Sequence, residues 1–197
     1  MFITFEGADG SGKSTQAELL REALAGEGRE VVLTREPGGT EVGERIRELV
    51  LHGPEMSPWA EATLFAAARA QHVDEVIRPA LARGAVVICD RYVDSSLAYQ
   101  GGGRGLGIDE VLELNLAATH GLLPDATFVL LLDPEVAAGR VTDPDRLERE
   151  GIALQAKVDA AYRELATRFP ERIVALDGAR PRGEIAQEIN DRLRDRS

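Results

Sequence analysis

A chain of 197 residues is long enough to bury one sizeable core and short for two, so a single domain spanning residues 1–197 is expected. Its 34 acidic and 23 basic residues give a formal charge of −11, which disfavours a nucleic-acid polymer as partner but suits a small anion in a locally basic pocket. The single cysteine, Cys89, excludes an internal disulfide, and no apolar run reaches the ~18 residues of a membrane span, so a cytoplasmic protein without a membrane partner is expected.

Five short apolar runs predict strands. They are rich in Val, Ile, Leu and Phe and are mostly continuous rather than alternating, which is typical of strands buried on both faces of a parallel sheet. The predicted strands are Phe2–Phe5, Val31–Thr34, Val86–Cys89, Thr127–Leu132 and Ile173–Leu176.

The segments between these strands have helical spacing. The predicted helices are Ser14–Ala25, Trp59–Ala82, a helix capped by Asp109 and running to about His120, Lys157–Phe169 and Arg182–Leu193. Strands that alternate with helices predict a doubly wound α/β fold, with a five-stranded parallel sheet flanked by helices. The glycine-rich segment 101–105 is interpreted as a loop, and Glu36-Pro37 is predicted to be a cis peptide bond because it lies in a turn beside the expected ligand.

The strongest motif is a phosphate-binding loop that directly follows the first strand and precedes the first helix. Gly7-Ala8-Asp9-Gly10-Ser11-Gly12-Lys13-Ser14 matches G-x-x-x-x-G-K-[ST] in full. Glycines let backbone N–H groups surround phosphate, Lys13 reaches the β- and γ-phosphates, and the Ser14 hydroxyl is a ligand for Mg²⁺. The expected ATP site comprises Gly7, Ala8, Asp9, Gly10, Ser11, Gly12, Lys13, Ser14 and Thr15.

A second anionic substrate is indicated by arginines outside this loop. Arg35 and Arg91 each directly follow a predicted strand, and ligands of open parallel sheets bind beyond the strand carboxyl ends. The alternative is that either arginine only pairs with a neighbouring carboxylate. A guanine-dependent switch would share the phosphate loop but usually carries N-K-x-D after a later strand, and this motif is absent from the sequence.

Further motifs resemble those of thymidylate kinases. The block Asp90-Arg91-Tyr92-Val93-Asp94-Ser95-Ser96-Leu97-Ala98-Tyr99-Gln100 is similar to the family's D-R-[YFH]-x-x-S-x-x-A-[YF] signature. Glu6-Gly7, the run from Thr34 to Thr40, the run from Leu64 to Arg69, and Asp145-Arg146-Leu147-Glu148 agree with the family in the same order. Together these segments span nearly the whole chain.

The resemblance implies the nucleoside-monophosphate-kinase fold, phosphorylation of dTMP to dTDP by ATP with Mg²⁺, and a homodimer. It implies a dTMP site in which Arg91 and Arg35 hold the acceptor phosphate, Phe65 and Arg69 contact the base, Ser96 and Gln100 line its wall, Tyr99 crowds the sugar C2′ and Asp9 reaches the 3′-OH. Phe65 alone would be interpreted as a core residue. Asp90 is expected to hold Mg²⁺ through water, together with Ser14. A kinase of dUMP, UMP or a deoxynucleoside is the nearest alternative.

The resemblance also implies a short lid at about residues 140–150 that supplies an arginine to the transferring phosphoryl group. Some family members carry Arg directly after the loop aspartate, where this chain has Gly10. Arg146 and Arg149 are the catalytic candidates, while Arg140 is expected to stack on adenine; the assignment among the three stays open. Only Val141-Thr142-Asp143-Pro144-Asp145 separates Arg140 from Arg146, which is shorter and more acidic than in bacterial relatives.

Overall fold

The computed structural model describes residues 1–140, 142 and 144–194, so Val141 and Asp143 of the expected lid lie outside the described residues. Five strands form one sheet in the order β2-β3-β1-β4-β5, and all four pairings are parallel. The strands are β1 Phe2–Gly7, β2 Val31–Arg35, β3 Val86–Asp90, β4 Ala126–Leu131 and β5 Ile173–Asp177. Each lies within two residues of its predicted limits, so the predicted sheet is confirmed.

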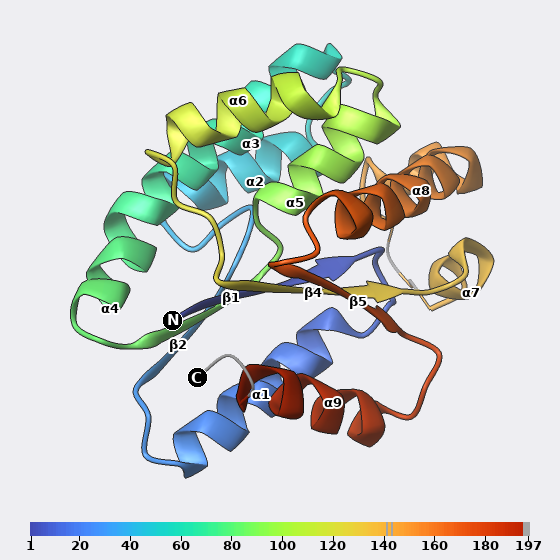
Figure 1. Ribbon diagram of the computed structural model, residues 1–197. Coiled ribbons are helices and arrows are strands. Elements are labelled where there is room, and N and C mark those ends of the chain that lie inside the picture. The colour runs from blue at the N-terminus through green and yellow to red at the C-terminus, as the bar shows by residue number, and fades with distance from the viewer. Residues whose placement is uncertain (141, 143, 195–197) are drawn as a thin grey trace.

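Helices cover both faces of the sheet (Figure 1). On one face, α1 (Lys13–Gly26) and α9 (Arg182–Arg194) pack against Ile3 and Phe5 of β1. The other face holds the larger core, around Phe2 and Val87. Its helices are α2 (Glu41–His52), α3 (Pro58–His72), the π-helix η1 (Val73–Ile77), α4 (Arg78–Ala82), α5 (Val93–Ser96), the π-helix η2 (Leu97–Gly103), α6 (Ile108–Ala118) and α8 (Ile152–Arg168).

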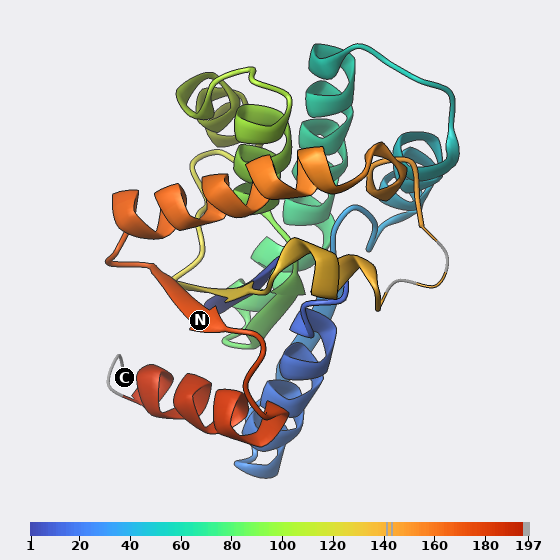
Figure 2. The same cartoon turned by 90° about the vertical axis from the view of Figure 1, so that its right-hand side faces the viewer.

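Short helices complete the chain near the carboxyl ends of the strands. The helix α7 (Pro134–Ala138) follows β4, and the short 3₁₀ helix η3 (Glu148–Glu150) leads into α8 (Figure 2). No helix among the described residues combines the length and apolarity that crossing a bilayer would require.

Three local predictions need correction. Gly101–Gly103 belong to η2 instead of a loop. Glycine is needed there for close packing between helices, because a Cβ on Gly102 would lie 2.6 Å from the Cβ of Ala161 in α8. Asp109 lies inside the first turn of α6, whose cap is Gly107 with φ 95°. The helix α8 begins at Ile152, five residues before the predicted start.

The register of the sheet brings the site residues together. Phe5 and Arg35 both pair with Asp90, so the ends of β1, β2 and β3 meet directly beside the phosphate loop. Alternation along β1 turns Glu6 away from α1, toward the face that carries η2 and α8, where its side chain contacts Ser95 and Tyr162. The predicted cis peptide bond at Glu36-Pro37 is confirmed, directly after β2.

Candidate active site

The phosphate loop leaves β1 in a backbone conformation that glycine permits. Gly7 has φ 134°, and a Cβ added there would lie 2.5 Å from the carbonyl oxygen of Leu130. Gly12, with φ 96°, caps α1, so the loop N–H groups and the positive end of the helix dipole meet at one place. The loop therefore has the backbone geometry of an anion site.

Gly10 is also fixed by its surroundings. It has φ 79°, and a Cβ would lie 2.5 Å from the carbonyl oxygen of Ala137 in α7. Arg140 closes over the same point by donating to the Gly10 carbonyl at 3.0 Å. A side chain at position 10 would have to displace α7, so this loop has no room for an arginine of its own.

Asp9 lies between two cations. Its Oδ1 is 2.9 Å from Nζ of Lys13 and 2.9 Å from Nη2 of Arg91. Burial alone would raise the pKa of Asp9, but Arg91 and Lys13 outweigh it and hold the pKa well below its usual range. The three side chains thus form a charged cluster of net +1 at the junction of loop and cavity.

Arg91 has an unusual backbone for a bulky residue, with φ 70°. Its Nη1 donates to Ser95 at 3.0 Å, and the Ser95 hydroxyl in turn donates to Glu6 at 2.5 Å. Its guanidinium lies 5.3 Å from the centroid of the Tyr99 ring. Burial would lower the pKa of Arg91, but Asp9 outweighs it and raises the pKa well above its usual value, so the side chain is a fixed cation.

A cavity of ≈ 270 Å³ opens beside this cluster. Seven of the eight residues predicted for dTMP binding line it together: Asp9, Phe65, Arg69, Arg91, Ser96, Tyr99 and Gln100. The lining also includes Glu36, Pro37, Arg47, Leu51, His52, Ser95, Asp145, Leu147 and Glu148. An apolar wall, buried donors and a fixed cation at one end suit a planar base that carries a phosphate.

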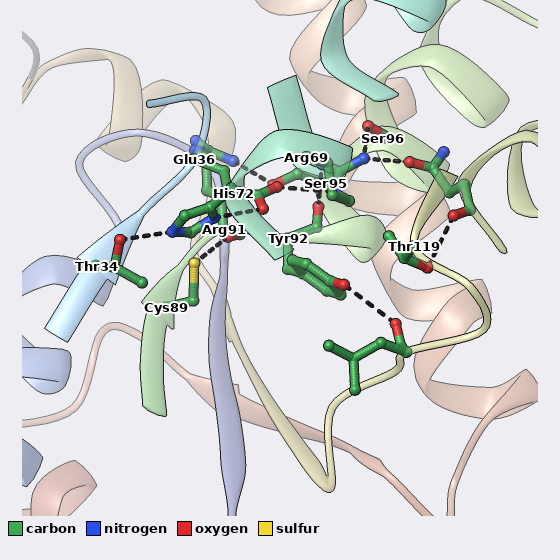
Figure 3. A network of polar contacts seen from close by, with 12 residues as sticks. Thr34, Glu36, Arg69, His72, Cys89, Arg91, Tyr92, Ser95, Ser96 and Thr119 are labelled. Atoms are coloured by element: carbon green, nitrogen blue, oxygen red, sulfur yellow. Dashed lines mark hydrogen bonds and ion pairs between the residues drawn. The ribbon is translucent and has the colours of Figure 1, made fainter. Parts of the chain in front are cut away.

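Arg69 is held from several sides (Figure 3). Its Nε donates to Glu36 at 2.7 Å, and Nη2 donates to the carbonyl oxygen of Tyr92 at 2.9 Å. Its Nη1 donates to Ser96 at 3.1 Å and to Asn115. Phe65 and Arg69 share one face of α3 as predicted, and both border the cavity.

Arg35, the eighth predicted residue, has a different position. Its Nη2 pairs with Glu44 at 3.0 Å, and its side chain is half exposed. It lines a second hollow together with Ser14 and Asp90. The structure thus shows Arg35 in the carboxylate pair that the sequence left as the alternative.

Ser14 and Asp90 are brought together as predicted for a metal site. The Ser14 hydroxyl donates to Oδ2 of Asp90 at 2.5 Å. Oδ1 of Asp90 is buried and has no hydrogen-bond partner among the described residues. A hydroxyl and a carboxylate with a free oxygen are the hard ligands that Mg²⁺ prefers, so these residues fit the ion.

The three arginines of the expected lid are placed differently. Arg146 is largely buried: its Nη2 pairs with Glu61 at 2.7 Å and its Nε donates to the Val50 carbonyl at 2.9 Å. Arg149 is exposed and donates only to a backbone oxygen, that of Asp145 at 3.1 Å, in the contacts described for it. Arg140 is exposed beside the loop and borders a hollow with Asp133 and Ala179.

Three carboxylates that the sequence did not single out support this arrangement. Glu61 is fully buried and accepts from Gln100, Arg104 and Arg146. Burial and Asp94 raise the pKa of Glu6 to about 7. Burial and nearby Asp9 raise the pKa of Glu148 to about 7. Glu6 and Glu148 stand within the quoted motifs, whereas Glu61 has no sequence signal apart from lying four residues before Phe65, on the same helix face.

Known proteins match the chain along nearly its full length. The family model for thymidylate kinase matches residues 5–189. The thymidylate kinase of Leifsonia xyli subsp. xyli is 56% identical over 198 residues, covering 98% of this chain and 94% of the relative. That of Clavibacter michiganensis subsp. michiganensis is 55% identical over 197 residues, covering 98% and 93%. The crystal structure of thymidylate kinase from Ehrlichia chaffeensis superposes with a TM-score of 0.81 at 34% identity, covering 98% of each chain. The chain therefore belongs to the thymidylate kinase family.

Proposed function

We infer that this protein phosphorylates dTMP to dTDP with ATP and Mg²⁺, by direct in-line transfer, in the synthesis of dTTP. The observation that carries this conclusion is the Lys13–Asp9–Arg91 cluster, which joins the phosphate loop to the cavity. Two anionic substrates can thereby meet end to end at one charged junction.

The acceptor is proposed to bind in the cavity with its base against Phe65 and its phosphate toward Arg91. A guanidinium binds phosphate through two parallel N–H donors, and the buried surroundings of Arg91 keep it oriented. Asp9 is proposed to accept from the 3′-OH, while Ser96, Tyr99 and Gln100 shape the wall and Arg69 faces the base. Arg35 would join the acceptor phosphate only after leaving Glu44, which is 3.0 Å away in this structure.

The donor is proposed to lie on the phosphate loop, with backbone N–H groups and Lys13 on its phosphates. Ser14 and Asp90 would hold Mg²⁺, and Mg²⁺ when bound neutralises charge on the β- and γ-phosphates. Lys13 and Arg91 keep positive charge where the transferred group carries negative charge, and no covalent intermediate is needed. Arg140, which already contacts the Gly10 carbonyl, is proposed to border the adenine.

We propose that Arg149 is the lid arginine that reaches the transferring phosphoryl group. Arg146 is bound by Glu61 and the Val50 carbonyl, so moving its head group would leave Glu61 with one donor fewer. Arg149 has no such commitment in the contacts described, and it directly follows Glu148, which lines the cavity. Arg146 would then anchor the lid, and Arg149 would contact the transferring phosphoryl group.

A coupled ADP-release assay with a panel of nucleoside monophosphates tests the function. Turnover is expected with dTMP and ATP–Mg²⁺, with slower turnover on dUMP and dCMP. A protein that binds ATP but gives no more ADP with dTMP than with buffer would refute the proposal.

Two helices of the larger core expose apolar side chains that could form a dimer interface. We propose a homodimer that uses α2 and α3, which expose Val42, Leu49 and Trp59 at 41–48% of their surface. We also propose that the enzyme works in the cytoplasm, where ATP and dTMP are available. Light scattering at several concentrations checks the dimer, and a strictly monomeric mass would exclude it.

A further inference from the structure

A buried chain of hydrogen bonds connects the sheet to the base-contacting arginine (Figure 3). Thr34 Oγ1 lies 2.7 Å from Nε2 of His72, and Nδ1 of His72 lies 2.8 Å from Oε1 of Glu36. The other carboxylate oxygen of Glu36 accepts from Nε of Arg69 at 2.7 Å. The side chains of His72, Glu36 and Arg69 are at most 3% exposed, so solvent does not compete for these contacts.

The hydrogen bonds from Thr34 through His72 to Glu36 have a defined donor-to-acceptor direction. An ionised carboxylate only accepts, so Nδ1 of His72 must carry the hydrogen that faces Glu36. In the neutral imidazole, Nε2 is then the acceptor and the Thr34 hydroxyl is the donor. Glu36 is thus held on one oxygen by His72, and it presents the other oxygen to Arg69 at a fixed angle.

The backbone around Glu36 leaves it little freedom. Its N–H donates to the carbonyl oxygen of Asp90 at 2.9 Å. Gly39 packs on His72: a Cβ there would lie 2.8 Å from Nε2 of the ring. The segment after β2 therefore encloses the Glu36–His72 pair from outside.

Most of the N–H donors of Arg69 are used by buried acceptors. A guanidinium has five N–H donors, and four of those of Arg69 are used by Glu36, Ser96, Asn115 and the Tyr92 carbonyl. Within the described residues one N–H of Nη2 has no acceptor, while Arg69 borders the cavity. A single donor held in place matches a carbonyl oxygen on a pyrimidine and opposes an amino group.

The Glu36–His72–Cys89 trio has ligand atoms within 4.8 Å of one another, which raises the alternative of a metal site. Each group already has another role: Arg69 neutralises Glu36, Thr34 pairs with His72, and Cys89 donates to the Arg91 carbonyl at 3.0 Å. Burial raises the pKa of the Cys89 thiol well above its usual value, which makes it a poor metal ligand. The hydrogen-bonded chain is the better description.

We propose that Glu36 and His72 are specificity-positioning residues: they fix the Arg69 guanidinium so that its one spare donor selects a base with a carbonyl over a base with an amino group at the same edge. This rests on the proposed function. Without the charge of Glu36, Arg69 is buried without its counter-ion and loses the partner that sets its plane. The preference for dTMP over dCMP then falls, while the rate of phosphoryl transfer changes less.

The test compares dTMP with dCMP on E36Q and on two variants of His72. Gln has the shape of Glu but no charge, so E36Q is expected to raise KM for dTMP roughly tenfold and to lower the dTMP-to-dCMP ratio of kcat/KM by roughly tenfold, with kcat less affected. In His72→Asn the amide nitrogen can replace Nδ1 and still donate to Glu36. In His72→Gln the amide nitrogen instead takes the place of Nε2, so it cannot donate to Glu36. H72N should therefore retain most of the selectivity, while H72Q should lose roughly three- to tenfold.

Unchanged selectivity in an E36Q protein with the wild-type thermal midpoint overturns the proposal. If E36Q fails to fold, the two His72 variants decide, because equal selectivity in H72N and H72Q also overturns it. Titration calorimetry of dTMP and dCMP gives the same ratio from binding alone. Absence of dTMP turnover in the wild type would refute the kinase function, whereas turnover with unchanged ratios in the variants would refute only the positioning role.

Discussion

Asp9 shows how one residue in the loop serves both halves of the site. Its carboxylate touches Lys13 of the phosphate loop and Arg91, which lines the cavity, each at 2.9 Å. Since the depressed pKa of Asp9 keeps it ionised throughout the physiological range, it is a permanent link between two cations. Its position is therefore a matter of geometry rather than of proton transfer.

Asp9→Asn should separate these cations from their shared anion at nearly constant shape. We expect kcat/KM for dTMP to fall roughly 10²-fold, because small displacements of positioning groups have effects of this size. The fall should be nearly independent of pH between 6 and 9, since the wild-type group does not titrate there. Steady-state kinetics across this range measure both effects. A variant that keeps most of its activity would show that Asp9 does not orient the reacting groups.

In the proposed lid, Arg146 and Arg149 have different surroundings. Arg146 joins Glu61 in α3 and the end of α2, while Arg149 extends into solvent. Arg149→Ala should lower kcat by 10²-fold or more with little change in KM and in thermal midpoint. Arg146→Ala should instead raise KM and lower the thermal midpoint, because it leaves buried Glu61 short of a donor.

Arg194→Ala is the matched control for both lid variants, since Arg194 is 73% exposed on α9, away from the proposed dimer face, and pairs only with Asp191 in the contacts described. Its kinetics and midpoint should equal those of the wild type. The lid assignment fails if Arg146→Ala, and not Arg149→Ala, shows the isolated loss of kcat.

The close contact between η2 and α8 at Gly102 can be tested by substitution. A Cβ at Gly102 would lie 2.6 Å from the Ala161 Cβ, so Gly102→Ala should push η2 away from α8 and destabilise by ~1–3 kcal/mol. Gly183 is also helical, in α9, but a Cβ there meets nothing within 4 Å. Gly183→Ala should stabilise by ~0.5–1 kcal/mol through helix propensity. Denaturant unfolding measures both, and equal effects would contradict the packing argument.

The same glycines show where the sequence was and was not informative. Strands buried on both faces leave continuous apolar runs, so the sheet was predictable; glycine reports a special backbone but does not say whether a turn or a close helix contact requires it. The helix α2 was not predicted, although Val42, Ile46 and Leu49 recur there at helical spacing and were a signal in the sequence. Its Thr40 cap, whose hydroxyl accepts from the Gly43 N–H, was a second available signal.

The site likewise contains residues that the sequence indicated and residues that it did not. Arg91 was predicted because it directly follows a strand and parallel strands deliver their carboxyl ends to one place, whereas Ser96 was expected only from the family resemblance. The roles of Glu61 and Glu36 depend on which arginine arrives from a distant element, and spacing along the chain does not encode that. The pairing of Arg35 with Glu44 is likewise a tertiary contact between β2 and α2.

At the scale of the whole molecule, buried acids make stability depend on pH in opposite directions. The pKa of Glu61 is lowered: burial opposes this, but donors from Arg104, Gln100 and Arg146 prevail. Like Asp9, it contributes stability that is lost as the pH falls through its folded pKa. Glu6 behaves in the opposite way, since burial and Asp94 raise its pKa from 4.5 to about 7, against Ser95 and Arg91.

Glu6→Gln isolates the contribution of this one acid. In the wild type, the stabilisation from protonated Glu6 is fully present below pH 4.5 and is lost as the pH rises through about 7, up to a change on the order of 3 kcal/mol. An amide does not titrate, so the free energy of unfolding of the wild type relative to Glu6→Gln should decline over that interval and then level off. Asp9 and Glu61 are present in both proteins and cancel in the difference. Urea unfolding of both proteins from pH 4.5 to 8 measures it, and a difference that stays constant would mean that Glu6 has an ordinary pKa and that Ser95, Tyr162 and Arg91 hold it as a carboxylate.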